Sequence, residues 1–324
     1  MSPAAHVTRP AGAPTPAPRR SGGPIPARRR ARLLVLAVAA LLGAGACGSD
    51  PPSSDAGAAG GSGTGTLRVS GSTTVNAVAA DAAEVLRARG MKITVDSSGG
   101  SAGGITQLGD GQVEVAMSSK EVSEDDKAAH PDVDFVSTEI GQDAVGVIIR
   151  KEVVDGGVKG LDKEQLKALF EGRVANWKEL GGPDLAVFVY DKEPGRGTRE
   201  VLDKYLYGKD AKAPPPPQSD NYAVVGGNEE TRTKLESTPG SVGPLSSSFI
   251  TGHPRLVALE VDGVAPTPAT VKDGSYPMSR PLFLVTNGPP TGAAKTFIDY
   301  VLSAEGQKLV NKHGYLNLHD LGLT

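Results

Sequence analysis

Three short turns rich in Gly, Ser and Thr separate strand-like from helix-like stretches of this chain. They span residues 70–74, 97–104 and 195–199. Each follows a run typical of a β-strand, and the first and third precede apolar residues at helical spacing. Strands that alternate with helices in this way predict an α/β fold.

A helix start built from such residues can hold an anion. The first N–H groups of a helix have no partner within it, and its N-terminus carries about half a positive charge. Glycine exposes the backbone and hydroxyls add donors, so three such starts indicate a site that surrounds an oxyanion. The best-placed side chains are Ser72, Thr73, Ser101 and Thr198. Each of them alone could instead cap its own helix.

The rest of the pattern alternates in the same way. We expect a helix over 75–86, a short strand over 133–136, a strand buried on both faces over 144–149 and a polar helix over 229–236. The four prolines at 214–217 predict a rigid surface loop. The body of the chain, 66–324, is long enough for two lobes.

The first 46 residues have the form of an export signal. Four arginines precede an apolar run over 33–42, which is shorter than the about 20 residues of a membrane span. Cys47 follows small residues, as in a bacterial lipobox where the thiol is lipidated; ordinary cleavage after Ala46 is the alternative. Residues 47–65 read as a flexible tether. We therefore expect an exported body anchored by lipid at the outer face of the cell membrane.

Composition narrows the ligands and partners. Cys47 is the only cysteine, which excludes an intrachain disulfide, and the scattered histidines show no metal-ligand spacing. We expect neither a metal nor another cofactor. Without residues 1–46 the formal charge falls from −3 to −10, because seven Arg and no Asp or Glu are removed. An acidic body argues against nucleic acid as a partner, and an anion would need a buried site with local donors.

Charged residues stand beside these turns. Arg196 and Arg199 belong to the third turn, and arginine is suited to bidentate contact with an oxyanion. Pairing with Glu193 or Glu200 is the alternative for both. Lys120 and Lys192 are weaker candidates, and we do not include them among the predicted ligand residues.

Asp143 is an acid at the entrance to the predicted buried strand. A carboxylate beside an anion requires a ligand that carries a proton, which favours hydrogen phosphate over sulfate. A strand-end cap or an ion pair with Arg150 is the alternative.

Longer runs of sequence resemble a known family. They read SGSTTV, GGSAGG, AMSSKE, QDAVGVII, LKALFEGRVANWKELGG, GRGTRE, VDGVAPTPATVKDGSYPMSRPLFLV and LSAEGQKLV. Together they span nearly all of residues 66–320 in order, and they resemble the phosphate-binding proteins of bacterial phosphate ABC transporters. The resemblance implies a periplasmic-binding-protein-like fold with two α/β lobes, each a mixed sheet flanked by helices, joined by two crossing strands.

The resemblance also implies how the chain is divided and used. One lobe would comprise 66–143 and 278–324, and the other 144–277. Phosphate would bind between them and pass to the permease of a transporter, with no enzymatic step, and we expect a monomer. The implied ligand residues are Ser72, Thr73, Ser101, Ser119, Asp143, Gly197, Thr198 and Arg199.

The chain departs from the family at the third turn. Relatives usually carry Ser where this chain has Arg196, and Lys120 and Lys192 stand where Arg is common. Arg196 could contact the anion directly, and we include it among the ligand residues, or it could enlarge and recharge the pocket.

Three other functions compete with phosphate capture. The segment 99–103 fits G-x-S-x-G, the motif of a serine hydrolase that would use Ser101, with His253, His313 or His319 as base. A receptor for molybdate, tungstate or sulfate could share the architecture, although Asp143 speaks against a fully ionised ligand. A surface lipoprotein that has kept the fold and lost transport is the third alternative.

Overall fold

The computed structural model describes residues 65–209 and 212–323, which belong to one compact unit of the chain, Ala59–Thr324. The predicted signal segment, Cys47 and all of the predicted tether except Gly65 lie outside the described residues. Within the described ranges, no helix is both long and apolar enough to cross a lipid bilayer.

In this part of the chain nine strands form one continuous sheet. Eight of them follow a single path, in the order β2 (Ile93–Asp96), β1 (Leu67–Gly71), β3 (Val115–Ser118), β11 (Ser279–Asn287), β4 (Phe135–Arg150), β8 (Ser241–Ser246), β6 (Phe188–Lys192) and β7 (Tyr222–Val225). The ninth, β9 (Leu256–Ala258), pairs with β4, and β5 (Gly160–Leu161) pairs separately with β10 (Glu260–Val261).

Each end of the sheet is parallel, and its middle is antiparallel. β1 runs parallel to both β2 and β3, and β6 runs parallel to both β7 and β8. The pairs that β4 makes with β11 and β8 are antiparallel, as is the pair of β11 with β3. The two parallel sets are therefore joined through the antiparallel strands β11 and β4, which make each half of the sheet mixed.

β4 belongs to both halves of this sheet. Its residues 135–144 pair with β11, and its residues 145–149 pair with β8. The predicted buried strand over 144–149 is confirmed, since Val145, Val147, Ile148 and Ile149 have no exposed surface. The prediction of a separate strand at 133–136 is wrong, because one strand of 16 residues continues through the polar stretch 137–143. That stretch pairs through its backbone, which leaves no apolar alternation to read in the sequence.

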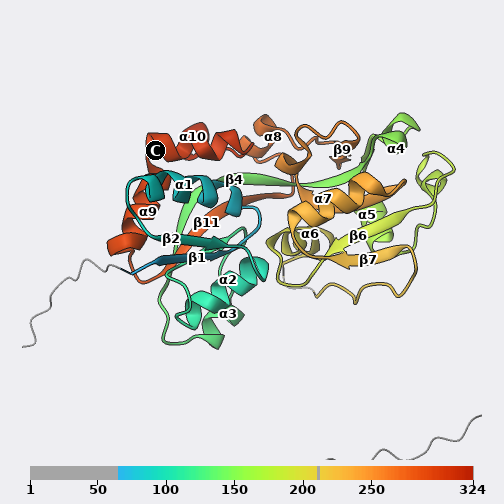
Figure 1. The fold of residues 1–324 in the computed structure, drawn as a ribbon. Coiled ribbons are helices and arrows are strands. Elements are labelled where there is room, and N and C mark those ends of the chain that lie inside the picture. Colours follow the sequence, from blue (N-terminus) through green and yellow to red (C-terminus); the bar gives the residue numbers. More distant parts are fainter. Residues whose placement is uncertain (1–64, 210–211, 324) are drawn as a thin grey trace, which may run out of the picture. The chain divides into compact units, whose positions relative to one another are not determined.

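Helices cover both faces of each half. On one side of β1, the core contains residues of α1 (Asn76–Ala88), α9 (Gly292–Leu302) and α10 (Ala304–Lys312). The opposite face carries α2 (Gly100–Gly109) and α3 (Glu124–Ala129), as Figure 1 shows. The predicted helix over 75–86 is thus confirmed as α1.

The other half repeats this arrangement. A large core joins β4 to α5 (Lys163–Phe170), η1 (Trp177–Leu180) and α6 (Gly197–Tyr207). A smaller core on the other face holds α7 (Asn228–Ser237), the predicted polar helix, and η2 (Ser247–Ile250). Three short helices complete the described chain: α4 (Lys151–Asp155), α8 (Pro268–Lys272) and α11 (Leu318–Leu321). The predicted two-lobed α/β fold is confirmed.

Candidate ligand-binding site

Five parallel strands end around one small cavity. Residues at or just after the carboxyl ends of β1, β2, β3, β6 and β7 line it, which is where ligands bind in α/β sheets. The cavity has a volume of about 10 Å³, close to what one water molecule needs. Its lining consists of Ser72, Thr73, Thr74, Gly100, Ser101, Ser119, Lys192, Arg196, Gly197, Thr198, Gly226 and Asn228.

Three buried serines line one part of this cavity, two of them just after β1 and β3 and the third in the first turn of α2. The Ser72 hydroxyl donates to Ser119 Oγ at 3.0 Å, and Ser101 Oγ lies 3.3 Å from the same atom. The backbone N–H of Ser119 donates to Ser101 Oγ at 3.1 Å. The cluster therefore presents neutral hydroxyls that can turn their protons towards a ligand.

The helix starts at the cavity have no side-chain caps. α2 begins after Gly99 and α6 begins after Arg196, and in neither case does the capping side chain accept a hydrogen bond from the helix. Ser101 and Thr198 lie inside the first turns of these helices, so they do not cap them. The capping alternative thus does not describe these two residues. The first N–H groups of α6 stay available to an anion, whereas in α2 those of Gly100 and Ala102 already donate to Ser97 O and Gly195 O.

Arg280 connects the two sides of the cavity from behind. This residue of β11 is 3% exposed, and its guanidinium donates to Thr198 Oγ1 and to Thr74 Oγ1, both at 3.0 Å. Thr74 follows β1 and Thr198 lies in the first turn of α6, so one side chain holds a wall residue from each half of the sheet.

Asp143 is the counterion of Arg280. The two residues face each other in the β4–β11 ladder, and Asp143 Oδ2 accepts from Arg280 Nε at 3.0 Å and from Nη2 at 2.8 Å. Its other oxygen accepts from the Ser246 hydroxyl at 2.7 Å. Complete burial raises the pKa of the Asp143 carboxyl, and the Arg280 charge acts in the opposite direction. Asp143 does not line the cavity.

Lys192 contributes a buried amine to the cavity wall. Its Nζ donates to Gly227 O at 3.2 Å and to Gly226 O at 3.4 Å, and it also contacts the Thr231 hydroxyl. Burial, together with the nearby charges of Arg196 and Arg280, lowers the pKa of Lys192 to about 7.

The comparison with known proteins places this arrangement in a family. A model of the PBP superfamily domain matches residues 56–305, which is more than half of the chain. The chain belongs to the PBP superfamily.

Several relatives within this superfamily are named as phosphate-binding proteins. The phosphate-binding protein PstS of Bacillus subtilis is 29% identical over 298 residues, which are 90% of this chain and 95% of the relative. A crystal structure from Clostridium perfringens, described as a phosphate ABC transporter substrate-binding protein with bound phosphate, is 30% identical with a TM-score of 0.68. The match covers 78% of this chain and 99% of that one. The family resemblance drawn from the sequence is confirmed.

A more distant structure supports the fold alone. An ABC-type phosphate transport receptor from Vibrio cholerae is 23% identical with a TM-score of 0.62, over 77% of this chain and 99% of that chain.

Seven of the nine ligand residues predicted from the sequence lie together in this PBP fold. They line the cavity: Ser72, Thr73, Ser101, Ser119, Arg196, Gly197 and Thr198. Asp143 lies behind the wall, and Arg199 does not line the cavity either. The Arg199 guanidinium pairs with Asp203 at 2.8 Å and with Asp191, whose carboxylate also accepts from the Tyr222 hydroxyl. The predicted roles of Asp143 and Arg199 as direct ligands stay predictions.

Sequence reasoning missed part of this site. Gly226 and Asn228 follow β7 and start α7, and the Asn228 amide donates to Thr74 Oγ1 at 2.9 Å. Their strand–Gly–Gly–helix pattern resembles that of the second recognised turn and could have identified them. Arg280 also escaped, although an arginine within an apolar strand requires a buried partner. Among the described residues no group of three or more His, Cys, Asp or Glu could hold a metal ion.

Replacing Asp143 by Asn separates a positioning role from direct contact. Asp143→Asn removes the charge that holds Arg280, so we expect the free energy of unfolding to fall by about 3 kcal/mol. We also expect phosphate and sulfate to bind more weakly, with both affinities reduced by the same factor. Calorimetry with both anions and thermal unfolding test this. Ser246→Ala, which removes only the neutral contact, is the milder control. A change of about tenfold or more in the ratio of phosphate affinity to sulfate affinity would instead support direct acceptance of the ligand's proton by Asp143.

The lowered pKa of Lys192 predicts that the protein takes up a proton when an anion binds. A bound dianion favours the ammonium form and raises the Lys192 pKa above about 7. Its contribution to binding is complete below pH 7 and is lost as the pH rises through the pKa of the complex. At about pH 8, calorimetry in two buffers of different ionisation enthalpy should show proton uptake that Lys192→Arg lacks, because arginine stays charged. Titration of phosphate itself is common to both proteins. Equal uptake by both would contradict the prediction.

Proposed function

We propose that this protein captures inorganic phosphate on the extracytoplasmic side of the membrane and delivers it to the permease of an ABC transporter. The observation that carries the proposal is the composition of the cavity wall. It combines buried hydroxyls, two uncapped helix starts and the cations Lys192 and Arg196, and no described carboxylate lines it. The names of the relatives from B. subtilis and C. perfringens identify the anion.

The cavity residues divide the work in this proposal. The phosphate oxygens accept hydrogen bonds from the backbone N–H of Gly197 and from the hydroxyls of Ser72, Thr73, Ser101, Ser119 and Thr198. Lys192 balances part of the phosphate charge. Asp143 acts through Arg280 to position Thr74 and Thr198, and Arg199 holds Asp191 beside Lys192.

The two lobes of the proposed receptor meet across the cavity. We assign 66–143 with 278–324 to one lobe and 144–277 to the other. Two of the hydrophobic clusters support this division, since one is confined to residues 67–140 and 282–315 and the other consists almost entirely of residues from 144–278. The Ala102 N–H donates to Gly195 O at 3.1 Å, and Lys120 pairs with Glu200 at 3.2 Å, across the division. Closure of the lobes over the ligand would form these contacts.

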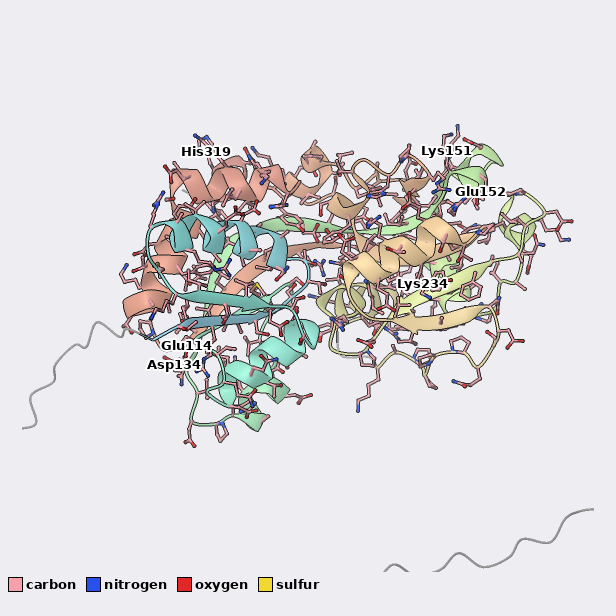
Figure 2. The ribbon with its side chains drawn as sticks, in the orientation of Figure 1. Glu114, Asp134, Lys151, Glu152, Lys234 and His319 are labelled. Carbon is pink, nitrogen blue, oxygen red and sulfur yellow. The ribbon has the colours of Figure 1, made fainter. Side chains whose placement is uncertain are left out.

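A binding protein fits the surroundings of Ser101 better than a hydrolase does. Among the described residues, Ser101 Oγ makes hydrogen bonds only with Ser119. His253 pairs with Glu236 and His313 pairs with Asp81, while His319 projects from the surface (Figure 2). The remaining described histidine, His130, lies 3.8 Å from Asp110, so no described histidine is hydrogen-bonded to Ser101 to activate it. We propose that the chain is a receptor, not an enzyme, and that it acts as a monomer.

Phosphate should stabilise the purified protein. A ligand at about 100 times its Kd adds about 2.7 kcal/mol to the free energy of unfolding. We expect a higher melting temperature with phosphate and smaller shifts with sulfate or molybdate. No shift with phosphate at millimolar concentration would contradict the proposal, and a larger shift with another oxyanion would reassign the ligand.

The predicted lipid anchor is tested separately. Cys47 follows the signal-like segment, and we propose that it carries the lipid that holds the receptor at the membrane. Wild-type cells fed labelled palmitate should incorporate label into this protein, and Cys47→Ala should abolish the label and release the protein from the membrane fraction. A wild-type mature chain that begins with an unmodified Cys47 would contradict the anchor.

A further inference from the structure

Arg196 is more exposed than most of the other polar residues that line the cavity. The side chains of Ser72, Ser101, Ser119, Lys192 and Thr198 are almost fully buried. Arg196 is half-buried, with 16% of its side chain exposed, and its partner Glu193 is 49% exposed. Arg196 is therefore the cavity-lining cation that also reaches solvent.

The guanidinium of Arg196 is held at this position by Glu193. Its Nη2 donates to Glu193 Oε2 at 2.7 Å and its Nε donates to the same oxygen at 3.1 Å. An ion pair of this exposure contributes about 1 kcal/mol or less, so it can open and close without a large barrier.

The Arg196 side chain lies between two glycines that belong to different lobes. A Cβ on Gly100, at the start of α2, would lie 2.7 Å from Arg196 Cδ. A Cβ on Gly226, after β7, would lie 3.1 Å from Arg196 Nη2. Both glycines line the cavity. The Arg196 side chain thus lies close to the backbone of both glycines, and the space between them is a slot that any larger residue at either position would narrow.

We propose that Arg196 is a gate: its side chain covers the ligand cavity, and phosphate enters and leaves when the side chain swings out of the slot between Gly100 and Gly226. The proposal rests on phosphate being the ligand. Glu193 holds the gate closed, and the two glycines provide the room that it needs. A gate slows entry and exit together, whereas a simple ligand contact slows exit alone.

The test is stopped-flow measurement of phosphate association and dissociation rates. In Arg196→Ser we expect both rates to rise by about tenfold while Kd changes by less than about threefold. A rise in the dissociation rate alone, with a proportional rise in Kd, would overturn the gate and make Arg196 a ligand contact. Unchanged rates would also overturn it.

Two further variants keep the test specific. Arg232 forms the same i,i+3 pair with Glu229, at 2.6 Å and with 19% of its side chain exposed, and it does not line the cavity. Arg232→Ser should leave both rates unchanged. Gly226→Ala keeps the Arg196 charge, but its added methyl group narrows the slot and disfavours the closed position of the Arg196 side chain. Both rates should therefore rise together, and a change in neither would contradict the gate. Absence of phosphate binding to the wild-type protein would refute the proposed function, whereas binding with unaltered rates in Arg196→Ser refutes only the gate.

Discussion

The ion pair between Asp143 and Arg280 is the interaction on which the rest of the site depends. A buried guanidinium is costly unless its donors are satisfied, and here a carboxylate and two threonine hydroxyls satisfy it. The two threonines follow β1 and β6, which lie on opposite sides of β11 and β4 in the sheet. The same pair that neutralises a charge within the sheet therefore also sets the separation of the cavity walls.

Around this pair, charge and neutral donors have different tasks. The charges behind the wall are matched with each other: Asp143 with Arg280, and Asp191 with Arg199. The donors at the wall are mainly hydroxyls and backbone N–H groups, which cost little to bury when they bond to each other or to a ligand. An acidic chain can hold an anion in this way because the binding groups act at short range in a site shielded from the surface. Charged residues such as Glu114, Lys151 and Lys234 stand on that surface (Figure 2).

The sequence predicted what is local. Ser72, Ser101 and Thr198 were found because each follows a strand and stands at or near a helix start, and strand ends meet in an α/β sheet. Ser119 was found through the family resemblance. Arg280 was not found because its role depends on the register between β4 and β11, which local patterns do not reveal. The direction of Arg199 was also beyond the sequence, since a residue in a first helical turn can face the ligand or the body of the lobe. The strand over 137–143 was not predicted because its partner strand, β11, lies more than 130 positions away in the chain.

The continuity of β4 has a consequence for folding. Its N-terminal part completes the sheet of one lobe, and its C-terminal part supplies Val145, Val147 and Ile149 to the core of the other. Neither lobe can lose its structure without removing a hydrogen-bonded edge or core residues from its neighbour. The two lobes are thus two halves of one cooperative unit, and a cut within β4 would leave two fragments that each lack part of their sheet.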